Sequence, residues 1–239
     1  MAVKKQTGKF IVFEGIDGSG KSTQTKLLAQ YLKEKNYAVV KIDFPQHGQK
    51  SSGLVDEYLT GKYGSPEEVG PYRASIFYAC DRYDASFQIK KWLQEGKIVI
   101  ADRYLASNIG HQGGKIKNKA QWLKYVKWLY NLEYNLFGIP KPDITIILKS
   151  NPDYSLKLSC QIIDQEKLAK RKAYLSGDKK DIHETNENHL AAALNSYLRA
   201  AQEFPKDFKV VDCLQKEQLL SPLKINQKII KVVNKFLKI

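Results

Sequence analysis

The sequence predicts an α/β fold in which one parallel β-sheet carries helices on both of its faces. Short apolar runs alternate along the chain with longer stretches whose apolar residues recur at helical spacing. Strands separated by helices in this way pair in parallel, and the connecting helices cover the sheet. The 239 residues suit one substantial domain with its own hydrophobic core, so we expect a single domain over 1–239.

Five strands and the helices between them follow in chain order. The run 10–13 ends at Glu14, and after a glycine-rich turn Leu28 and Leu32 mark a helix. Gly96 ends a helix that passes through Trp92, directly before the third strand. The expected strands are 10–13, 38–44, 97–101, 143–148 and 209–212. The expected helices are 22–35, 71–92, 121–136, 188–203 and 221–236, with Ser221 as the cap of the last.

One segment departs from this alternation. Residues 164–187 are polar and strongly charged, with a turn at Gly177 and little apolar periodicity. The plain interpretation is a solvated loop. A loop of this length inside a compact domain more often has a function, and its cations suit a lid that closes over phosphates. We therefore expect a short mobile lid at about 164–187.

The formal net charge of +14 is compatible with two classes of protein. One class binds nucleic acid, and the other acts on small polyphosphate substrates. Specific recognition of nucleic acid and phosphate favours the planar guanidinium group, yet only five of the 39 basic residues are arginines and the lysines are scattered. We expect a basic enzyme surface and no nucleic-acid partner. The five arginines are Arg73, Arg82, Arg103, Arg171 and Arg199.

Neither membrane segments nor cysteine chemistry is expected. No stretch approaches the roughly 18 uninterrupted apolar residues of a membrane helix, so we expect no membrane partner and a cytoplasmic location. Cys80, Cys160 and Cys213 lie far apart and in no metal-ligand or redox spacing. We expect them to be reduced and mostly buried.

Residues 15–22 match the phosphate-loop pattern G-x-x-x-x-G-K-[ST] at every fixed position, after a strand and at the start of a helix. In such a loop the backbone N–H groups point inward at the phosphates, and the helix N-terminus adds partial positive charge. Lys21 would reach the β- and γ-phosphates of ATP, and Ser22 would hold Mg²⁺. The expected ATP-binding residues are Gly15, Ile16, Asp17, Gly18, Ser19, Gly20, Lys21, Ser22 and Thr23.

Asp17 begins to distinguish among the many proteins that share this loop. A carboxylate beside a triphosphate is unfavourable unless it turns away and accepts a hydrogen bond from another group. A sugar hydroxyl of an acceptor is a suitable donor. The alternative is an aspartate that only caps the turn.

Two further constellations suit an acceptor nucleotide. Asp102 and Arg103 follow a buried strand at its carboxyl end, where Asp102 can hold Mg²⁺ through water and Arg103 can bind a phosphate; a structural salt bridge is the competing interpretation. Tyr78 and Arg82 are four residues apart on one helical face, which suits stacking on a base and binding its carbonyl group. An aromatic core residue beside a surface arginine is the alternative.

Five motifs together resemble the thymidylate kinase family, in order from about residue 10 to residue 148. They are the phosphate loop with Asp17, Phe44-Pro45, the series Tyr78-Ala-Cys-Asp-Arg82, the series Asp102-Arg-Tyr-Leu-Ala-Ser-Asn108, and Pro140-Lys-Pro-Asp143. Related nucleotide kinases share the loop without the whole series. The resemblance implies a P-loop NTPase-type five-stranded parallel sheet, a homodimer, and transfer of the γ-phosphate of Mg-ATP to dTMP to give dTDP.

The resemblance also assigns roles residue by residue. Asp17 would take the 3′-hydroxyl of the acceptor and Arg103 its 5′-phosphate, Tyr78 would stack on thymine, and Arg82 would meet a base carbonyl. Asn108 and Gln112 fall where base-contacting residues occur in different branches. The expected acceptor site is Asp17, Phe44, Tyr78, Arg82, Arg103, Asn108, His111 and Gln112. The expected metal ligands are Ser22 and Asp102, and the expected catalytic residues are Asp17, Lys21, Arg103 and Arg171.

The chain departs from the family pattern at several positions. His111 stands where many relatives have an aromatic residue that helps to reject a ribose, and Lys149 stands where an aspartate is commoner. His47 lies near the place of an arginine for the acceptor phosphate, which Lys50 could replace. Gly18 occupies the position of a catalytic loop arginine in one branch. Since phosphoryl transfer needs further positive charge, we expect Arg171, the only arginine of the lid segment, to supply it.

Other functions remain open at this point. The acceptor could be another nucleotide such as dUMP, UMP or CMP, or a nucleoside, although nucleoside kinases would be expected to carry Glu-Arg-Ser in place of Asp102-Arg103-Tyr104. A GTPase is disfavoured because no Asn-Lys-x-Asp motif is present to read guanine. An ATPase that binds nucleic acid is a remote alternative, which would rest on the net charge.

Overall fold

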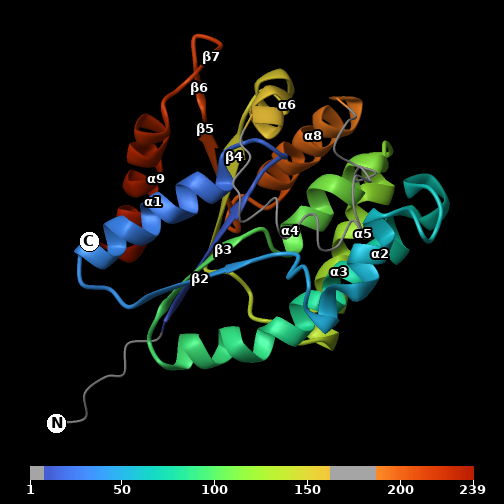
Figure 1. Ribbon diagram of the computed structural model, residues 1–239, viewed down its shortest axis with the longest axis horizontal. Helices are drawn as coiled ribbons and strands as arrows, with labels where there is room; N and C mark the ends of the chain where they lie inside the picture. The colour runs from blue at the N-terminus through green and yellow to red at the C-terminus, as the bar shows by residue number, and fades with distance from the viewer. Residues whose placement is uncertain (1–7, 162–186) are drawn as a thin grey trace.

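The computed structural model describes residues 8–161 and 187–239. Its centre is a five-stranded sheet in the order β2-β3-β1-β4-β5, and each pair of neighbouring strands is parallel (Figure 1). This confirms the predicted fold class. The strands are β1 (Lys9–Glu14), β2 (Val39–Asp43), β3 (Ile98–Asp102), β4 (Ile144–Lys149) and β5 (Phe208–Asp212).

Helices cover both faces of the sheet, as Figure 1 shows. On one face lie α1 (Lys21–Glu34) and α9 (Pro222–Leu237). On the other face lie α3 (Pro66–Gln94), α5 (Lys119–Tyr130) and α8 (Glu187–Glu203).

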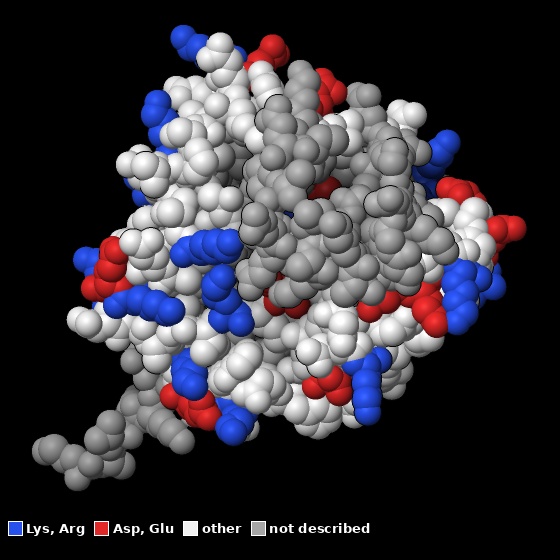
Figure 2. Space-filling model, in the orientation of Figure 1, with Lys and Arg blue, Asp and Glu red and all other residues white. Residues whose placement is uncertain are grey.

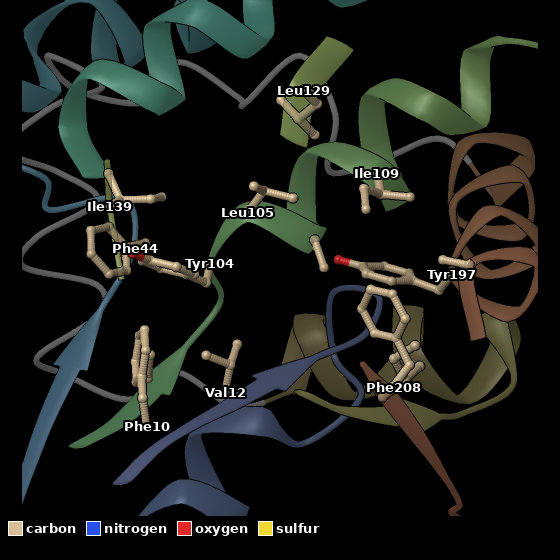
Figure 3. Packing of buried hydrophobic residues seen from close by; sticks show 14 of the residues in the cluster. Phe10, Val12, Phe44, Tyr104, Leu105, Ile109, Leu129, Ile139, Tyr197 and Phe208 are labelled. Carbon is tan, nitrogen blue, oxygen red and sulfur yellow. The ribbon is translucent and has the colours of Figure 1, made fainter. Parts of the chain in front are cut away.

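The two faces bury alternate residues of the same strands, because successive side chains of a strand point in opposite directions. In β1, Ile11 joins the cluster with α1 and α9, whereas Phe10 and Val12 join the cluster with α3, α5 and α8. The central strand is therefore apolar along nearly its whole length, which is typical of a parallel sheet buried on both faces. Figure 3 shows part of the second cluster, where the ring of Tyr197 lies between Ile109 and Phe208.

Several short elements connect these layers. They are the 3₁₀-helices η1 (Lys50–Ser52) and η3 (Gly113–Lys115), the helices α2 (Gly53–Leu59), α4 (Leu105–Ser107) and α6 (Pro152–Gln161), the π-helices η2 (Asn108–Gln112) and η4 (Asn131–Leu136), and the antiparallel strands β6 (Leu214–Gln215) and β7 (Gln218–Leu219). The expected helix over 121–136 is thus α5 followed by a π-helical turn, a change of winding that apolar spacing does not reveal.

Helix α3 begins earlier than the apolar spacing predicted. Ser65 and Glu68 form a capping box, in which the hydroxyl of Ser65 accepts from the Glu68 N–H and the carboxylate of Glu68 accepts from the Ser65 N–H. Gly70 then interrupts the helical geometry with φ 73°. The last helix agrees with the prediction, since Ser221 accepts a hydrogen bond from the Lys224 N–H at the start of α9.

Two expectations drawn from the sequence concern membrane helices and cysteines. No helix in 8–161 and 187–239 is long and apolar enough to cross a membrane. Cys213 is buried, Cys80 is half-buried, and both are free thiols; the side chain of Cys160 lies outside the part that the structure describes.

The approach of α8 to the π-helix η2 depends on a glycine. A Cβ atom on Gly110 would lie 2.3 Å from the ring carbon Cε2 of Tyr197, which is fully buried. We expect Gly110→Ala to lower the free energy of unfolding by about 1–3 kcal/mol, because the overpacked core must shift the tyrosine ring. Denaturant unfolding measures this change.

Gly53→Ala is the matched control. Gly53 has helical geometry (φ −53°), and a Cβ atom there would meet nothing within 4 Å. This variant should keep or slightly raise the stability. Equal losses in the two variants would contradict the packing argument for Gly110.

Candidate active site

The carboxyl ends of β1, β3 and β4 lie side by side at one edge of the sheet. Phe13 of β1 is in register with Asp102 of β3, and Glu14 is in register with Ile147 of β4. The phosphate loop leaves β1 at this edge and enters α1. Ligands of open α/β sheets bind at such an edge, and the loop and the Asp102-Arg103 pair therefore border the same space.

The phosphate loop is organised around Lys21. This lysine begins α1, is buried, and donates from Nζ to the carbonyl oxygens of Gly15 (3.0 Å) and Ile16 (2.8 Å). The hydroxyl of Ser19 is buried without a hydrogen-bond partner among the described residues, so its hydrogen-bonding capacity is unused there. The predicted ATP-binding residues are thus gathered on one loop and the first turn of α1.

Gly18 has a packing reason to be glycine. Its φ is 75°, and a Cβ atom would lie 1.9 Å from the carbonyl oxygen of Ser155 in α6. An arginine at this position would require the backbone of α6 to move. The helix therefore occupies the space that a loop arginine would need.

Asp17 and Arg103 form an ion pair across the site, with Nη2 of Arg103 donating to Oδ1 of Asp17. Arg103 has φ 71° in the left-handed region, and its N–H donates to the carbonyl oxygen of Phe13 (2.9 Å). Burial alone would raise the pKa of Asp17, but the positive charges of Arg103 and Lys21 outweigh it and hold that pKa below its usual range. The salt bridge of Arg103 is therefore made with the phosphate loop.

His111 contacts Arg103 and also His189, which lies in α8. Nη1 of Arg103 is 3.1 Å from Nε2 of His111, and Nδ1 of His111 is 3.2 Å from Nε2 of His189. A guanidinium group can only donate, so Nε2 of His111 accepts and its Nδ1 carries the proton that is donated to His189. Burial lowers the pKa of both histidines below the ordinary value, and Arg103 adds to this at His111. We missed His189 in the sequence because it adjoins the lid segment and has no motif of its own.

Glu14 ties these elements together and was not predicted as a site residue. It is fully buried and accepts from the Tyr104 N–H (2.8 Å), the Ser107 hydroxyl (2.7 Å) and the Tyr197 hydroxyl (2.9 Å). Burial raises the pKa of Glu14. Its partners come from the loop after β3 and from α8, so this carboxylate positions the loop that carries Arg103. The signal in the sequence was a charged residue that ends an apolar strand directly before the phosphate loop.

Arg82 lies in the core, with 2% of its side chain exposed. Its Nε and Nη2 donate to the two carboxylate oxygens of Glu133 at 2.6 and 2.8 Å, and its Nη1 lies 3.4 Å from the carbonyl oxygen of Tyr104. The alternative of a surface arginine is therefore wrong. Tyr78 is half-buried, and its ring is 6.3 Å from that of Tyr58. Glu133, which the sequence analysis missed, fixes the plane of the Arg82 guanidinium.

The loop after β2 is held by a second buried carboxylate. Asp81 accepts from the Gln46 N–H (2.9 Å) and the Ser51 hydroxyl (2.8 Å). Nδ1 of His47 lies 2.5 Å from Oδ1 of Asp56, and Lys50 is exposed.

Phe44, which we predicted in the acceptor site, is 6% exposed and packs its ring against Tyr104 at 5.5 Å. Figure 3 shows the two rings in contact. Phe44 therefore belongs to the core beneath the site.

The two amides of the π-helix η2 differ in their surroundings. Nδ2 of Asn108 donates to the carbonyl oxygen of Ser75 (3.2 Å), so this end of the amide is used inside the protein. Gln112 is buried and accepts at Oε1 from Nζ of Lys115 (2.9 Å).

Ser22 and Asp102 provide a donor set that suits Mg²⁺. Asp102 is 6% exposed at the carboxyl end of β3, and Ser22 lies in the first turn of α1. No cluster of three or more His, Cys, Asp or Glu that could hold a metal occurs among the described residues. A hydroxyl and a carboxylate fit an ion that takes most of its ligands from substrate phosphates and water.

Two remaining predictions concern charged residues. Lys149, for which the sequence offered no explanation, pairs with Asp212 at 2.9 Å and so joins the ends of β4 and β5. Arg171 and residues 164–186 of the expected lid lie outside the described residues, and Glu187 begins α8.

The surface charge agrees with the interpretation of most lysines as solvated. On the face shown in Figure 2, lysines and arginines stand scattered among aspartates and glutamates, and no continuous basic stripe is visible.

The site brings together Asp17, Lys21, Arg103 and His111. Comparison with known proteins shows to which family a chain with this site belongs. The family model for thymidylate kinase matches residues 13–221. The thymidylate kinase of Thermoanaerobacter sp. (strain X514) is 31% identical over 232 residues, which cover 96% of this chain and 99% of the relative. That of Plasmodium falciparum (isolate 3D7) is 33% identical over 156 residues, which cover 65% of this chain and 68% of the relative.

The fold comparison agrees. The solved structure of thymidylate kinase from Candida albicans is similar with a TM-score of 0.68 and 25% sequence identity, covering 96% of this chain and 92% of that one. Because the family model spans most of the sequence, this chain belongs to the thymidylate kinase family.

Proposed function

We propose that this protein transfers the γ-phosphate of ATP to dTMP and so produces dTDP. The observation that carries the proposal is the Asp17–Arg103 ion pair, which sets a carboxylate and a guanidinium beside Lys21 of the phosphate loop. Asp17 suits the 3′-hydroxyl of the acceptor, and Arg103 suits its 5′-phosphate. Members of the thymidylate kinase family are nucleoside monophosphate kinases, which supports the reaction class.

In this reaction an oxygen of the acceptor 5′-phosphate attacks the γ-phosphorus of ATP, the bond to the bridging oxygen breaks, and ADP leaves. The protein contributes position and charge, because phosphoryl transfer needs little covalent help. The loop N–H groups and Lys21 hold the donor, and Arg103 holds the acceptor phosphate. Ser22 and Asp102 would hold Mg²⁺, which neutralises charge on the phosphate oxygens when it is bound.

The protonation states of Asp17 and His111 suit the binding of an acceptor nucleotide. The low pKa of Asp17, which Arg103 and Lys21 maintain against burial, keeps it a hydrogen-bond acceptor at neutral pH. His111 stays neutral because burial and Arg103 hold its pKa well below the ordinary value, so no extra positive charge enters the pocket. His111 is smaller than the aromatic residue expected at this position, so we expect the site to exclude a ribose less strictly. Other monophosphates such as dUMP, UMP and CMP are therefore the alternative acceptors. The remote alternative is an ATPase that binds nucleic acid, and the scattered basic side chains on the face shown in Figure 2 do not favour it.

A coupled ADP-release assay over a panel of nucleoside monophosphates tests this function. We expect the highest kcat/KM with dTMP, and Lys21→Ala as the control should abolish release with every acceptor, because the phosphates lose their cation. Activity with none of the monophosphates would overturn the proposal. A preference for UMP or CMP would assign the alternative acceptor.

We further propose that Arg171 supplies the catalytic positive charge that the loop lacks. Gly18 leaves no room for an arginine in the loop, and Arg171 is the only arginine of the segment 164–187. Arg171→Ala should lower kcat by roughly 10³-fold or more with little change in dTMP affinity, and Lys172→Ala should remain near normal. Single-turnover kinetics and titration calorimetry measure the two quantities. Near-normal turnover of Arg171→Ala would refute the role.

A homodimer is the proposed assembly, with α3 as its interface. Tyr72, Ile76, Tyr83 and Phe87 recur along one face of α3, and more than a third of each is exposed. An identical helix of a second copy suits this stripe, since a two-fold axis places the same patch on both chains.

For an enzyme that acts on free nucleotides, a cytoplasmic location is the matching proposal.

Light scattering on a sizing column tests the assembly. The expected mass is about twice the 27.3 kDa of one chain. Ile76→Glu with Phe87→Glu should give monomers, because two charges would be buried in an apolar interface. Leu223→Glu is the control, as Leu223 is 66% exposed on α9 at the opposite face of the sheet. A monomeric parent chain, or dimers that survive the double substitution, would contradict this assignment.

A further inference from the structure

Lys115 contacts residues that lead toward both the phosphate end and the base end of the proposed acceptor site. It ends the 3₁₀-helix η3, three residues after Gln112, and Gln112 directly follows His111, which contacts Arg103. Lys115 also contacts Tyr58, whose ring is 6.3 Å from that of Tyr78. The mechanism described above makes no use of this lysine.

The ammonium group of Lys115 is directed at three oxygen atoms. Nζ lies 2.9 Å from Oε1 of Gln112, 3.3 Å from the hydroxyl of Tyr58 and 3.4 Å from the carbonyl oxygen of Pro66. An ammonium group has three N–H donors and no acceptor. These three partners therefore match its three hydrogens, and the shortest contact is the one with Gln112.

This contact decides which end of the Gln112 amide faces inward. A carboxamide can in principle turn by 180° and exchange its oxygen with its NH₂ group. Here only the oxygen can face Lys115, because an NH₂ group beside an ammonium would set donor against donor. Gln112 is 1% exposed, so the unmade hydrogen bond would not be replaced by bulk water.

The nitrogen of the same amide remains available for a ligand. Among the residues that the structure describes, Nε2 of Gln112 makes no hydrogen bond, and it is not one of the polar atoms sealed away without a partner. The amide thus presents a donor at Nε2 and the second lone pair of Oε1 as an acceptor.

Pyrimidine bases differ in the pattern that they offer to such a group. Thymine and uracil present an acceptor at O4 beside a donor at N3–H, whereas cytosine presents a donor at N4 beside an acceptor at N3. The amide as oriented by Lys115 pairs with the first pattern. Cytosine would require the turned amide, which Lys115 opposes.

We propose that Lys115 is a specificity-determining residue, which holds the Gln112 amide in the orientation that pairs with thymine or uracil and rejects cytosine. This inference rests on the proposed function, because it takes the acceptor to be a pyrimidine nucleotide in this pocket. Lys115 acts through Gln112 and is a positioning residue for recognition.

The ratio of the dissociation constants for dCMP and dTMP, measured by titration calorimetry at pH 7 on the full chain, tests the proposal. Lys115→Met should lower this ratio roughly tenfold or more, because dCMP binding gains when the turned amide costs nothing. Lys115→Arg keeps only donors beside the amide and should retain the parent ratio. Lys117→Met makes the same chemical change at an exposed site two residues away and should also retain it.

The parent chain offers a second measurement that needs no variant. Burial lowers the pKa of Lys115 to about 8, although Glu67 opposes this. A neutral amine can accept from a turned amide, so the ratio should fall between pH 7 and pH 9. Among the described residues, the titratable groups that face Lys115 are Tyr58 of α2, Glu67 of α3 and His189 of α8. Burial keeps the pKa of His189 below its ordinary value, so it stays neutral over this range.

The outcomes separate this inference from the proposed function. Binding of dTMP without its phosphorylation would refute the kinase activity, and the ratio would still test the amide. An unchanged ratio in Lys115→Met, with no decline toward pH 9, would overturn the role of Lys115. Loss of discrimination in Lys115→Arg, or no binding of either nucleotide by the parent chain, would overturn it as well.

Discussion

The buried carboxylate of Glu14 is the interaction on which the arrangement of the active edge depends. It stands at the end of the central strand and accepts three hydrogen bonds from groups that are distant in sequence. Removing such a carboxylate from water is unfavourable, and the three donors offset that cost only while all of them are in place. The phosphate loop, the loop that carries Arg103 and the helix α8 therefore have one mutual position.

Cations that can only donate hydrogen bonds impose a single orientation on groups that could adopt two. Arg103 selects the tautomer of His111, and through it the role of His189. Lys115 does the same for the amide of Gln112. Both devices lie on one short segment after β3, which combines a π-helix with a 3₁₀-helix. The irregular winding brings neighbouring side chains into different pockets, because it departs from the regular angular spacing of an α-helix.

Much of the fold could be predicted from the sequence, because buried parallel strands and the helices between them have recognisable local patterns of apolar residues. Every predicted strand overlaps an observed one, and the phosphate loop was placed by its own motif. The beginning of α3 was missed because its first turn is defined by the capping pair Ser65 and Glu68 and carries little apolar periodicity.

Site residues that belong to a sequence motif could be predicted. Site residues that are defined only by a contact with a residue far away in the sequence were missed. Asp17 and Arg103 were identified singly, but their ion pair spans 86 positions of the chain. Glu133 meets Arg82 across 51 positions, and Tyr197 meets Glu14 across 183. No spacing rule connects such residues, since only the packed sheet and its covering helices bring them together.

The contact between Gly18 and Ser155 constrains how this enzyme can change over evolutionary time. A side chain at position 18 collides with the backbone of α6, so no choice of residue at position 155 alone would relieve it. An arginine could enter the loop only after the helix had already been displaced by other substitutions. A loop arginine is thus separated from this arrangement by an epistatic barrier, and a lineage that starts here cannot cross that barrier in one mutational step.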